Sequence, residues 1–229
     1  MKIVCIHGQN HKGSTYHIGR MLADRFPDGE IREFFLPRDL DHFCLGCYRC
    51  VERSEDCPFF EEKNSIMQAV EEAELLIFTT PTYCFHASAS MKAFIDLTFT
   101  YWMSHKPRAC MFSKKAVVLS TAAGTGAKSA VKDITKTLFY WGVPYIKAYG
   151  IAVQAMNWGQ VSDKKKAKIS ADMDKLASKI QKKKPRVGFK TKFIFSMMRM
   201  MQLNNWGASK AEKAYWEENG WLGKKRPWR

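Results

Sequence analysis

The chain has 229 residues, a formal net charge of +15 and 46% hydrophobic residues. This length suits one domain with an extension and is ample for a single hydrophobic core. No secretory signal opens the sequence, and every apolar run is far shorter than the ~20 residues that cross a membrane. We therefore expect a soluble cytoplasmic protein with no transmembrane segment.

The basic excess lies in the C-terminal third of the chain. Residues 1–150 contain 18 Lys and Arg and 16 Asp and Glu, whereas residues 151–229 contain 19 and 6. Such a segment can meet nucleic acid, an anionic membrane, an acidic partner or a phosphorylated dinucleotide, or it can be an ordinary solvated surface. No recognisable nucleic-acid-binding module accompanies it, so we expect no nucleic-acid partner.

Strands and helices are predicted to alternate along the chain. Short, mostly apolar runs predict buried strands at 2–7, 31–36, 75–79, 116–120 and 145–153. Apolar residues at helical spacing predict a helix capped by Ser14 or Thr15, and further helices over 61–72, 88–102, 128–141 and 162–184. This alternation indicates βαβ units and a doubly wound five-stranded parallel sheet in the flavodoxin-like order 2-1-3-4-5.

The turn after the first strand has the composition of a phosphate cradle. It reads Gly8-Gln-Asn-His-Lys-Gly13-Ser14-Thr15. A nucleoside-triphosphate P-loop needs Lys directly after its second glycine, and Ser14 stands there instead. Hydroxyls, amides and backbone N–H groups at a helix N-terminus suit one monophosphate, and we expect these donors to come from Gln9, Asn10, Ser14 and Thr15, with Lys12 as charge partner. The Gly/Thr/Pro-rich loops after the third and fourth strands should lie at the same sheet edge.

Four cysteines lie between the second strand and the following helix, in the pattern Cys44-x2-Cys47-x2-Cys50-x6-Cys57. This is iron–sulfur ligand spacing, and four thiolates also satisfy a tetrahedral zinc site. A third alternative is that the cysteines are free and pack as small hydrophobes. A total of seven cysteines, an odd number, with three inside one heptapeptide makes a secreted disulfide framework implausible.

Over about residues 1–150 the sequence resembles the flavodoxin-like, NADPH-dependent FMN reductase family, and within it the iron–sulfur flavoproteins. The resemblance rests on the Gly8–Thr15 turn, the four cysteines, the Pro81-x-Tyr83…Met91-Lys-x-Phe-x-Asp96 string and the loop 121–126. It implies that Ser14 and Thr15 hold the phosphate of FMN. It also implies two sets of flavin contacts: Pro81, Thr82, Tyr83, Cys84 and Phe85 along the isoalloxazine, and Thr121, Ala122, Gly124 and Gly126 at its pyrimidine or ribityl side.

The last third of the chain has no counterpart in a minimal flavodoxin domain. We therefore expect an FMN-binding domain at 1–160 and a basic helical extension at 161–229. Within the extension, Phe189, Phe193, Met197 and Met201 recur every four residues and predict an amphipathic basic helix. The extension can cover the protein's own core or a second subunit, lie on an anionic membrane, or close over the flavin site.

The function expected from these features is an FMN-dependent NAD(P)H oxidoreductase that forms a homodimer. Reduced nicotinamide would give hydride to flavin N5, and the electrons would pass to a small-molecule acceptor such as a quinone or to a [4Fe–4S] cluster on the four cysteines. The alternatives are a flavodoxin-like electron carrier without its own substrate and a non-redox binding module. No catalytic residue is assigned; His86 and His105 are candidates.

Overall fold

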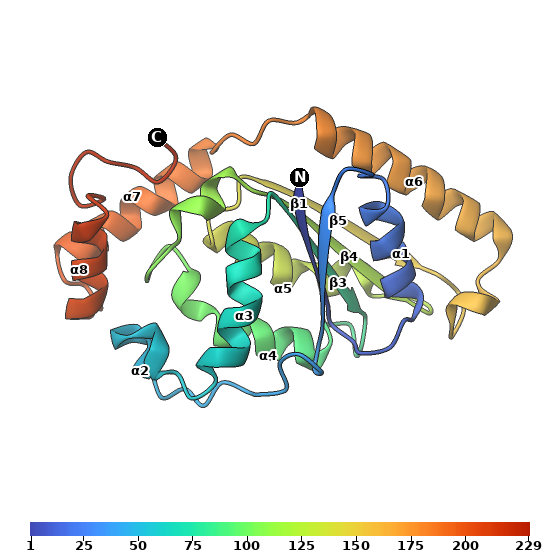
Figure 1. The fold of residues 1–229 in the computed structure, drawn as a ribbon, viewed down its shortest axis with the longest axis horizontal. Coiled ribbons are helices and arrows are strands. Elements are labelled where there is room, and N and C mark those ends of the chain that lie inside the picture. Colours follow the sequence, from blue (N-terminus) through green and yellow to red (C-terminus); the bar gives the residue numbers. More distant parts are fainter.

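The computed structural model describes residues 1–229 and contains one five-stranded sheet (Figure 1). The strands are β1 (Lys2–His7), β2 (Glu30–Phe35), β3 (Leu75–Pro81), β4 (Lys115–Ala122) and β5 (Tyr145–Ala152). Their order is β2-β1-β3-β4-β5, and all four neighbouring pairs are parallel. The predicted flavodoxin-like topology is therefore confirmed.

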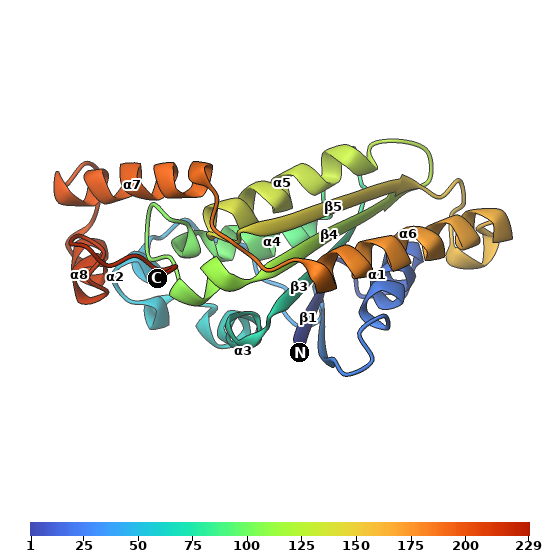
Figure 2. The same ribbon diagram turned by 90° about the horizontal axis from the view of Figure 1, so that it is seen from above.

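Helices cover both faces of the sheet (Figure 2). On one face lie α1 (Ser14–Ala23) and α6 (Asp163–Lys182), and on the other lie α3 (Phe60–Glu72), α4 (Ala89–Leu97) and α5 (Ala127–Tyr140). Right-handed crossovers between parallel strands produce this two-sided arrangement. None of the helices combines the length and apolarity needed to span a membrane.

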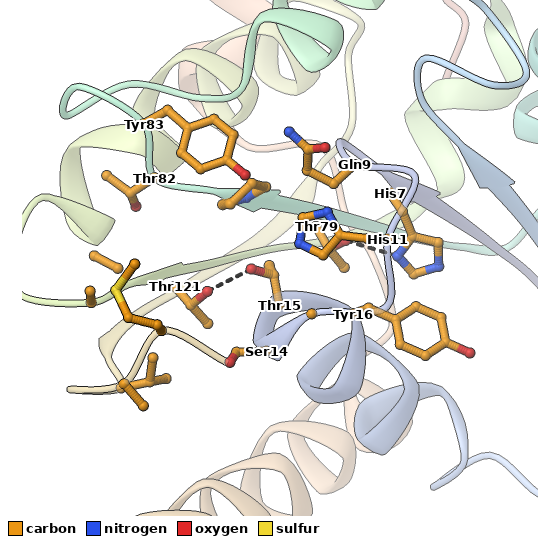
Figure 3. A pocket seen from close by; sticks show the side chains of 17 residues that line it. His7, Gln9, His11, Ser14, Thr15, Tyr16, Thr79, Thr82, Tyr83 and Thr121 are labelled. Carbon is orange, nitrogen blue, oxygen red and sulfur yellow. Dashed lines mark hydrogen bonds between the residues drawn. The ribbon is translucent and has the colours of Figure 1, made fainter. Parts of the chain in front are cut away.

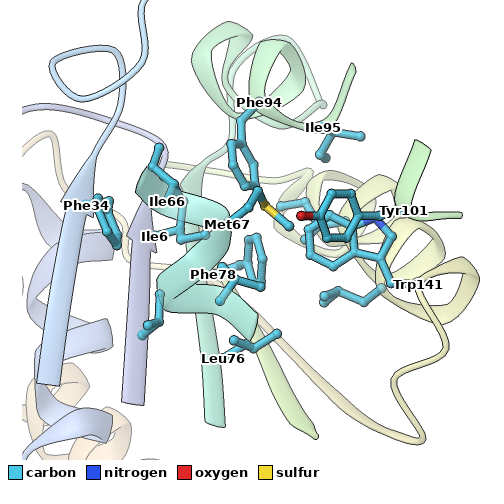
Figure 4. Packing of buried hydrophobic residues seen from close by; sticks show 14 of the residues in the cluster. Ile6, Phe34, Ile66, Met67, Leu76, Phe78, Phe94, Ile95, Tyr101 and Trp141 are labelled. Atoms are coloured by element: carbon cyan, nitrogen blue, oxygen red, sulfur yellow. The ribbon is translucent and has the colours of Figure 1, made fainter. Parts of the chain in front are cut away.

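Each face of the sheet has its own core. The larger cluster lies under α3, α4 and α5, where the aromatic rings of Phe78, Phe94 and Trp141 meet at centroid distances of 6.3 to 6.5 Å (Figure 4). The second cluster joins α1 to α6 through residues such as Leu22 and Met173. Because the central strands are buried on both faces, β3 and β4 are nearly continuous apolar runs.

Two further helices, α7 (Phe189–Leu203) and α8 (Lys210–Glu218), lie at the end of the molecule away from α1 and α6 (Figures 1 and 2). They form a third cluster, in which Phe195, Trp216 and Trp221 pack on Met103 and Phe112. The C-terminal helices are thus anchored on the segment between α4 and β4 by their own apolar core.

Two predicted helix limits are wrong. The N-cap of α1 is Gly13, so Ser14 and Thr15 lie inside the first turn instead of capping it. The helix predicted over 88–102 ends at Leu97, where the Thr98 hydroxyl donates to the Phe94 and Ile95 carbonyls, and a 3-10 turn follows at Phe99–Tyr101. A Thr side chain that bonds the preceding turn competes with continuation of the helix.

Candidate functional site

A cavity of about 290 Å³ opens at the carboxyl edge of the sheet, beside the N-terminus of α1 (Figure 3). The register of the strands aligns this edge, since His7 pairs with Thr79 and Pro81 with Thr121. The cavity is lined by His7, Gln9, His11, Gly13, Ser14, Thr15, Tyr16, Thr79, Pro81, Thr82, Tyr83, Thr121, Ala122, Ala123, Val153, Ala155 and Met156. Ligands of doubly wound sheets bind at this edge.

The turn after β1 is held tightly against β3 and α4. The Gly8 N–H donates to the Thr79 carbonyl at 2.7 Å, and the Ser88 hydroxyl donates to the Gly8 carbonyl at 2.6 Å. A Cβ at Gly8 would lie 2.6 Å from the Ser88 Oγ, so a larger residue would push the turn away. This contact fixes where α1 begins.

The first turn of α1 faces the cavity with free hydrogen-bond donors. No side chain caps the helix, and its first turn contains no acidic residue. Backbone N–H groups at a helix start attract an anion, and the partial positive charge of the helix terminus adds to this. Gln9, Ser14 and Thr15 line the cavity, as expected of cradle residues. Asn10 and Lys12 do not line it.

The Lys12 ammonium lies 5.4 Å from the ring centroid of Tyr16, which lines the cavity, but Lys12 itself is not one of the lining residues.

Pro81 at the end of β3, and Thr82 and Tyr83 in the loop after it, line the cavity. Tyr83 and His86 exchange two backbone hydrogen bonds of 2.9 and 3.0 Å, which closes a two-residue turn. The two central residues, Cys84 and Phe85, have φ values of 49° and 68°, in the left-handed region that disfavours side chains other than those of Gly and Asn. Neither residue lines the cavity, and both are exposed.

The end of β4 contributes Thr121 and Ala122, and the loop after it contributes Ala123. The Thr121 and Thr15 hydroxyls lie 2.5 Å apart and join this loop to the start of α1 (Figure 3). Gly124 and Gly126 do not line the cavity; Gly126 is the N-cap of α5 with φ 95°. A Cβ at Gly126 would lie 2.8 Å from the Phe85 ring, so this glycine makes room for the turn after β3.

Several lining residues are absent from the sequence prediction. They include His7, Thr79 and Tyr16, and the loop after β5 adds Val153, Ala155 and Met156. The rule that places ligands at the carboxyl ends of parallel strands applies equally to β5, so it could have identified this fourth loop. The part of this loop that lines the cavity, residues 153–156, contains none of the Gly, Ser and Thr residues that made the other three conspicuous.

His7 is a buried member of the cavity wall. Its Nδ1 lies 2.9 Å from the Thr79 hydroxyl and its Nε2 lies 3.0 Å from a Glu33 carboxylate oxygen, and Arg20 lies 3.4 Å from the other oxygen. The hydrogen bond from His7, followed by the charge of Arg20, holds the pKa of Glu33 below its ordinary value despite partial burial. These contacts fix the ring orientation of His7.

The two candidate catalytic histidines lie outside the cavity. His86 is exposed, and its Nδ1 lies 3.8 Å from Asp133. The Nδ1 of His105 lies 2.5 Å from Glu212 of α8, so this histidine ties the C-terminal helices to the main domain. Neither His86 nor His105 lines the cavity.

The four cysteines Cys44, Cys47, Cys50 and Cys57 line a second cavity of about 340 Å³. Gly46 and Tyr48, both with positive φ, reverse the loop so that Cys44 and Cys47 remain exposed while Cys50 and Cys57 are buried. The short helix α2 (Arg49–Glu52) carries Cys50. All seven cysteines of the chain are free thiols.

The positions of the four cysteines can be compared with the geometry of a zinc site. A single zinc ion with Zn–S bonds of about 2.3 Å would bring its sulfur ligands to roughly 3.8 Å from one another. No three of the four cysteine ligand atoms lie within 4.8 Å of one another. Burial raises the pKa of Cys50, and the neighbouring Cys57 and Cys44 raise it further, against the opposing charge of Lys63. In this arrangement no three of the four sulfur atoms are close enough together to bind one zinc ion.

The fold agrees with those of solved azoreductases at low sequence identity. The structure of an azoreductase from Bacillus anthracis has a TM-score of 0.58 and 15% identity, and the match covers 80% of this chain and all of that one. An FMN-dependent NADH-azoreductase from the same species, solved in complex with FMN, has a TM-score of 0.55 and 11% identity over 77% of this chain and all of that one. At such identities the likeness shows the fold alone.

Sequence comparison identifies the family of the chain as well as its fold. An iron-sulfur flavoprotein of Archaeoglobus fulgidus is 26% identical over 196 residues, which cover 84% of this chain and 86% of the relative. An FMN-dependent NADH:quinone oxidoreductase of Bordetella petrii is 25% identical over 157 residues, 60% of this chain and 76% of the relative. The family model described as NADPH-dependent FMN reductase matches residues 1–157. With its fold, its cavity and this match in agreement, the chain belongs to the NADPH-dependent FMN reductase family.

Proposed function

We propose that this FMN-dependent NAD(P)H oxidoreductase holds FMN in the cavity at the carboxyl edge of the sheet and sends electrons to an iron–sulfur cluster on its four cysteines. One observation carries the first half of the proposal: the uncapped start of α1 and the loops after β1, β3, β4 and β5 all meet at one cavity. Its volume of about 290 Å³ is near the lower end of the range for small-molecule sites.

Ser14 is the side chain best placed to bind the phosphate group of FMN. It lines the cavity in the first turn of α1, and its hydroxyl has no hydrogen-bond partner within the protein. The Thr15 hydroxyl, by contrast, already pairs with Thr121. We therefore assign Ser14 and the backbone N–H groups of the turn to the phosphate, and Thr15 to orienting the loop after β4.

The wall for the flavin ring would come from the loop after β3. Tyr83 lines the cavity and is held by its backbone pairing with His86, while the Thr82 hydroxyl bonds Ser120 at 2.9 Å. FMN, when bound, supplies hydride acceptance from NAD(P)H and release of the electrons one at a time. The protein's own part is to bind and orient the FMN and to leave one side of the flavin open for the nicotinamide. The exposed residues Tyr83 and Met156 lie at that side.

The four cysteines are proposed to hold a [4Fe–4S] cluster. Four thiolates are the donor set of such a cluster, and they surround a cavity wide enough to separate their sulfur atoms. The likeness to the Archaeoglobus fulgidus iron-sulfur flavoprotein supports this choice over zinc. Two of the ligands, Cys44 and Cys47, are exposed, so the cluster would lie near the surface, where an external acceptor can reach it.

The flavin assignment is tested by the affinity of the apoprotein for FMN. We expect Ser14→Ala to raise the dissociation constant about tenfold, since a hydrogen bond to a charged group contributes about 1.5 kcal/mol or more. Thr15→Val should have a smaller effect. Ser196→Ala, which removes an exposed hydroxyl on α7, is the matched control and should leave FMN affinity unchanged. Equal affinities for the wild type and Ser14→Ala would refute the phosphate assignment.

The cluster assignment is tested by protein purified without oxygen. We expect flavin absorption together with a broad visible shoulder that bleaches on reduction, and iron bound to the wild type. Cys50→Ala should lose the iron and keep the FMN, whereas Cys110→Ala should keep both, because Cys110 lies outside the four-cysteine cavity. Zinc in place of iron, or the same iron content in Cys50→Ala, would contradict the cluster. Quinone reduction by an iron-free Cys50→Ala variant would then identify a small-molecule acceptor.

A further inference from the structure

Helix α7 has two apolar sides, and the protein covers only one of them. The inner side carries Phe195, which is fully buried against Trp216 and Trp221. The outer side carries five large apolar residues that are 40% to 84% exposed: Phe189, Phe193, Met197, Met200 and Leu203. We call these five residues the outer face of α7. Single exposed hydrophobic residues are ordinary, but five on one face of one helix mark a binding surface.

Most of the other exposed apolar side chains lie at or beside the two cavities. Tyr83 and Met156 line the flavin cavity, Phe85 lies in the same turn as Tyr83, and Leu45 and Tyr48 line the cysteine cavity. Met1, Phe43 and Trp206 are single exposed residues outside both linings. The outer face of α7 borders neither cavity, so the proposed redox function leaves it unexplained.

Helix α7 and the chain segments that flank it are strongly basic. Residues 182–211 contain eight Lys and Arg and no Asp or Glu. Lys182, Lys183, Lys184 and Arg186 lead into α7, and Lys192 lies on its exposed side; none of these five forms an ion pair within the protein. Unpaired cations beside an apolar strip are the features of a helix that lies in a membrane interface.

We propose that the outer face of α7 docks onto an anionic phospholipid surface. The apolar side chains would enter the boundary between headgroups and acyl chains, and the flanking lysines would meet the lipid phosphates. With 15 residues α7 is about 22 Å long, too short to cross a hydrocarbon core of about 30 Å, so the helix would lie in the plane of the surface.

A second copy of the chain is the competing occupant of this face, and the charges disfavour it. Two copies that met through α7 would bring together two segments, residues 182–211 of each copy, with eight cations and no carboxylate in either. An anionic bilayer supplies the missing countercharge. Figures 1 and 2 place α7 at the end of the molecule away from α1, so docking would leave the flavin cavity uncovered.

Flotation of the full-length holoprotein with lipid vesicles tests the proposal. We expect binding to vesicles that contain phosphatidylglycerol, little binding to pure phosphatidylcholine, and a loss of binding when salt shortens the Debye length from about 10 Å at 0.1 M to about 3 Å at 1 M. The double variant Phe189→Ser/Phe193→Ser should bind at least about tenfold more weakly because it removes two buried rings from the interface.

Matched control variants distinguish lipid binding by the outer face of α7 from non-specific binding by other exposed apolar or charged residues. Phe43→Ser removes an exposed ring from the cysteine loop and should leave vesicle binding unchanged. Lys132→Glu/Lys136→Glu reverses two exposed charges on α5, and its effect should be much smaller than that of Lys184→Glu/Lys192→Glu. Because the α7 variants alter only exposed side chains, we expect them to fold as the wild type does. Retained FMN and an unchanged circular dichroism spectrum would verify this.

Three results would overturn the proposal. The first is wild-type protein that does not float with anionic vesicles. The second is a double phenylalanine variant that binds as well as the wild type. The third is a double phenylalanine variant that sediments as a monomer while the wild type sediments as a larger species and shows no lipid dependence; that outcome would assign the face to a second copy of the chain.

Discussion

Glu212 is a buried carboxylate whose contacts link α8 to the main domain. One oxygen accepts from His105 at 2.5 Å, and the other accepts from the backbone N–H of Ser209 at 2.8 Å in a capping box. Burial by itself raises the pKa of Glu212, but the hydrogen bonds from His105 and Ser209 outweigh it, and the net pKa lies below the ordinary value. A carboxylate with a lowered folded-state pKa stabilises the fold above its unfolded pKa.

We expect Glu212→Gln to lower the free energy of unfolding by about 1–3 kcal/mol at neutral pH, because it weakens a charge-assisted hydrogen bond and a helix cap. The difference from the wild type should shrink as the pH falls from about 4.3, the unfolded pKa of Glu, through the lower folded value. Urea unfolding at several pH values measures this. Glu217→Gln, on the same helix but exposed, is the control, and a pH-independent difference would contradict this account.

At the scale of single elements, the sequence predicts those helices and strands whose limits depend on hydrophobic periodicity and on glycine residues in turns. The strands follow from apolar runs such as 75–79, and α6 starts where Ser162 caps it. The early end of α4 at Leu97 was not predictable, because the stretch up to Trp102 keeps a helical pattern while the Thr98 side chain ends the helix. The lining of the cavity was predictable to the same extent. Ser14 and Tyr83 lie in recognisable sequence motifs, whereas Met156 lies in a loop whose sequence matches no motif.

The packing of α6 on α1 gives a prediction for an element. Met173 of α6 is fully buried in the same cluster as Leu22 of α1. Arg25, which follows the end of α1, donates hydrogen bonds to Ser170 and Asp174 of α6. We expect Met173→Ala to destabilise the protein by about 2–5 kcal/mol through lost burial and a cavity. Met200→Ala, on the exposed side of α7, should change stability by less than about 0.5 kcal/mol. Equal effects of the two substitutions in thermal or urea unfolding would show that α6 is not part of the core.

At the scale of the whole molecule, the C-terminal helices are held by contacts between residues far apart in sequence. Trp216 packs with Met103 and Phe112, and its indole N–H donates to the His105 carbonyl at 2.6 Å. The sequence predicts an amphipathic helix here but not its partner, since an apolar stripe specifies burial and not the surface that receives it.

Trp216→Ala should therefore release α7 and α8 from the main domain. We expect a loss of about 3–5 kcal/mol from the local free energy of opening, seen as faster amide hydrogen exchange in residues 189–218, with unchanged protection in the sheet. Trp206→Ala, at an exposed position, is the control and should alter neither region. Uniformly faster exchange throughout the chain would mean that the extension and the sheet unfold as one unit.

The left-handed conformation of Cys84 and Phe85 is unfavourable for the residues that occupy this turn. A chain selected for stability alone would place Asn and Gly at such a tip, because each L-side chain held in a left-handed conformation costs about 1–2 kcal/mol. A thiol and a phenyl ring stand there instead, directly after Tyr83 of the cavity wall. Strained residues of this kind cluster at functional sites, so the conformation points to a role for this turn beside the cavity that stability alone does not explain.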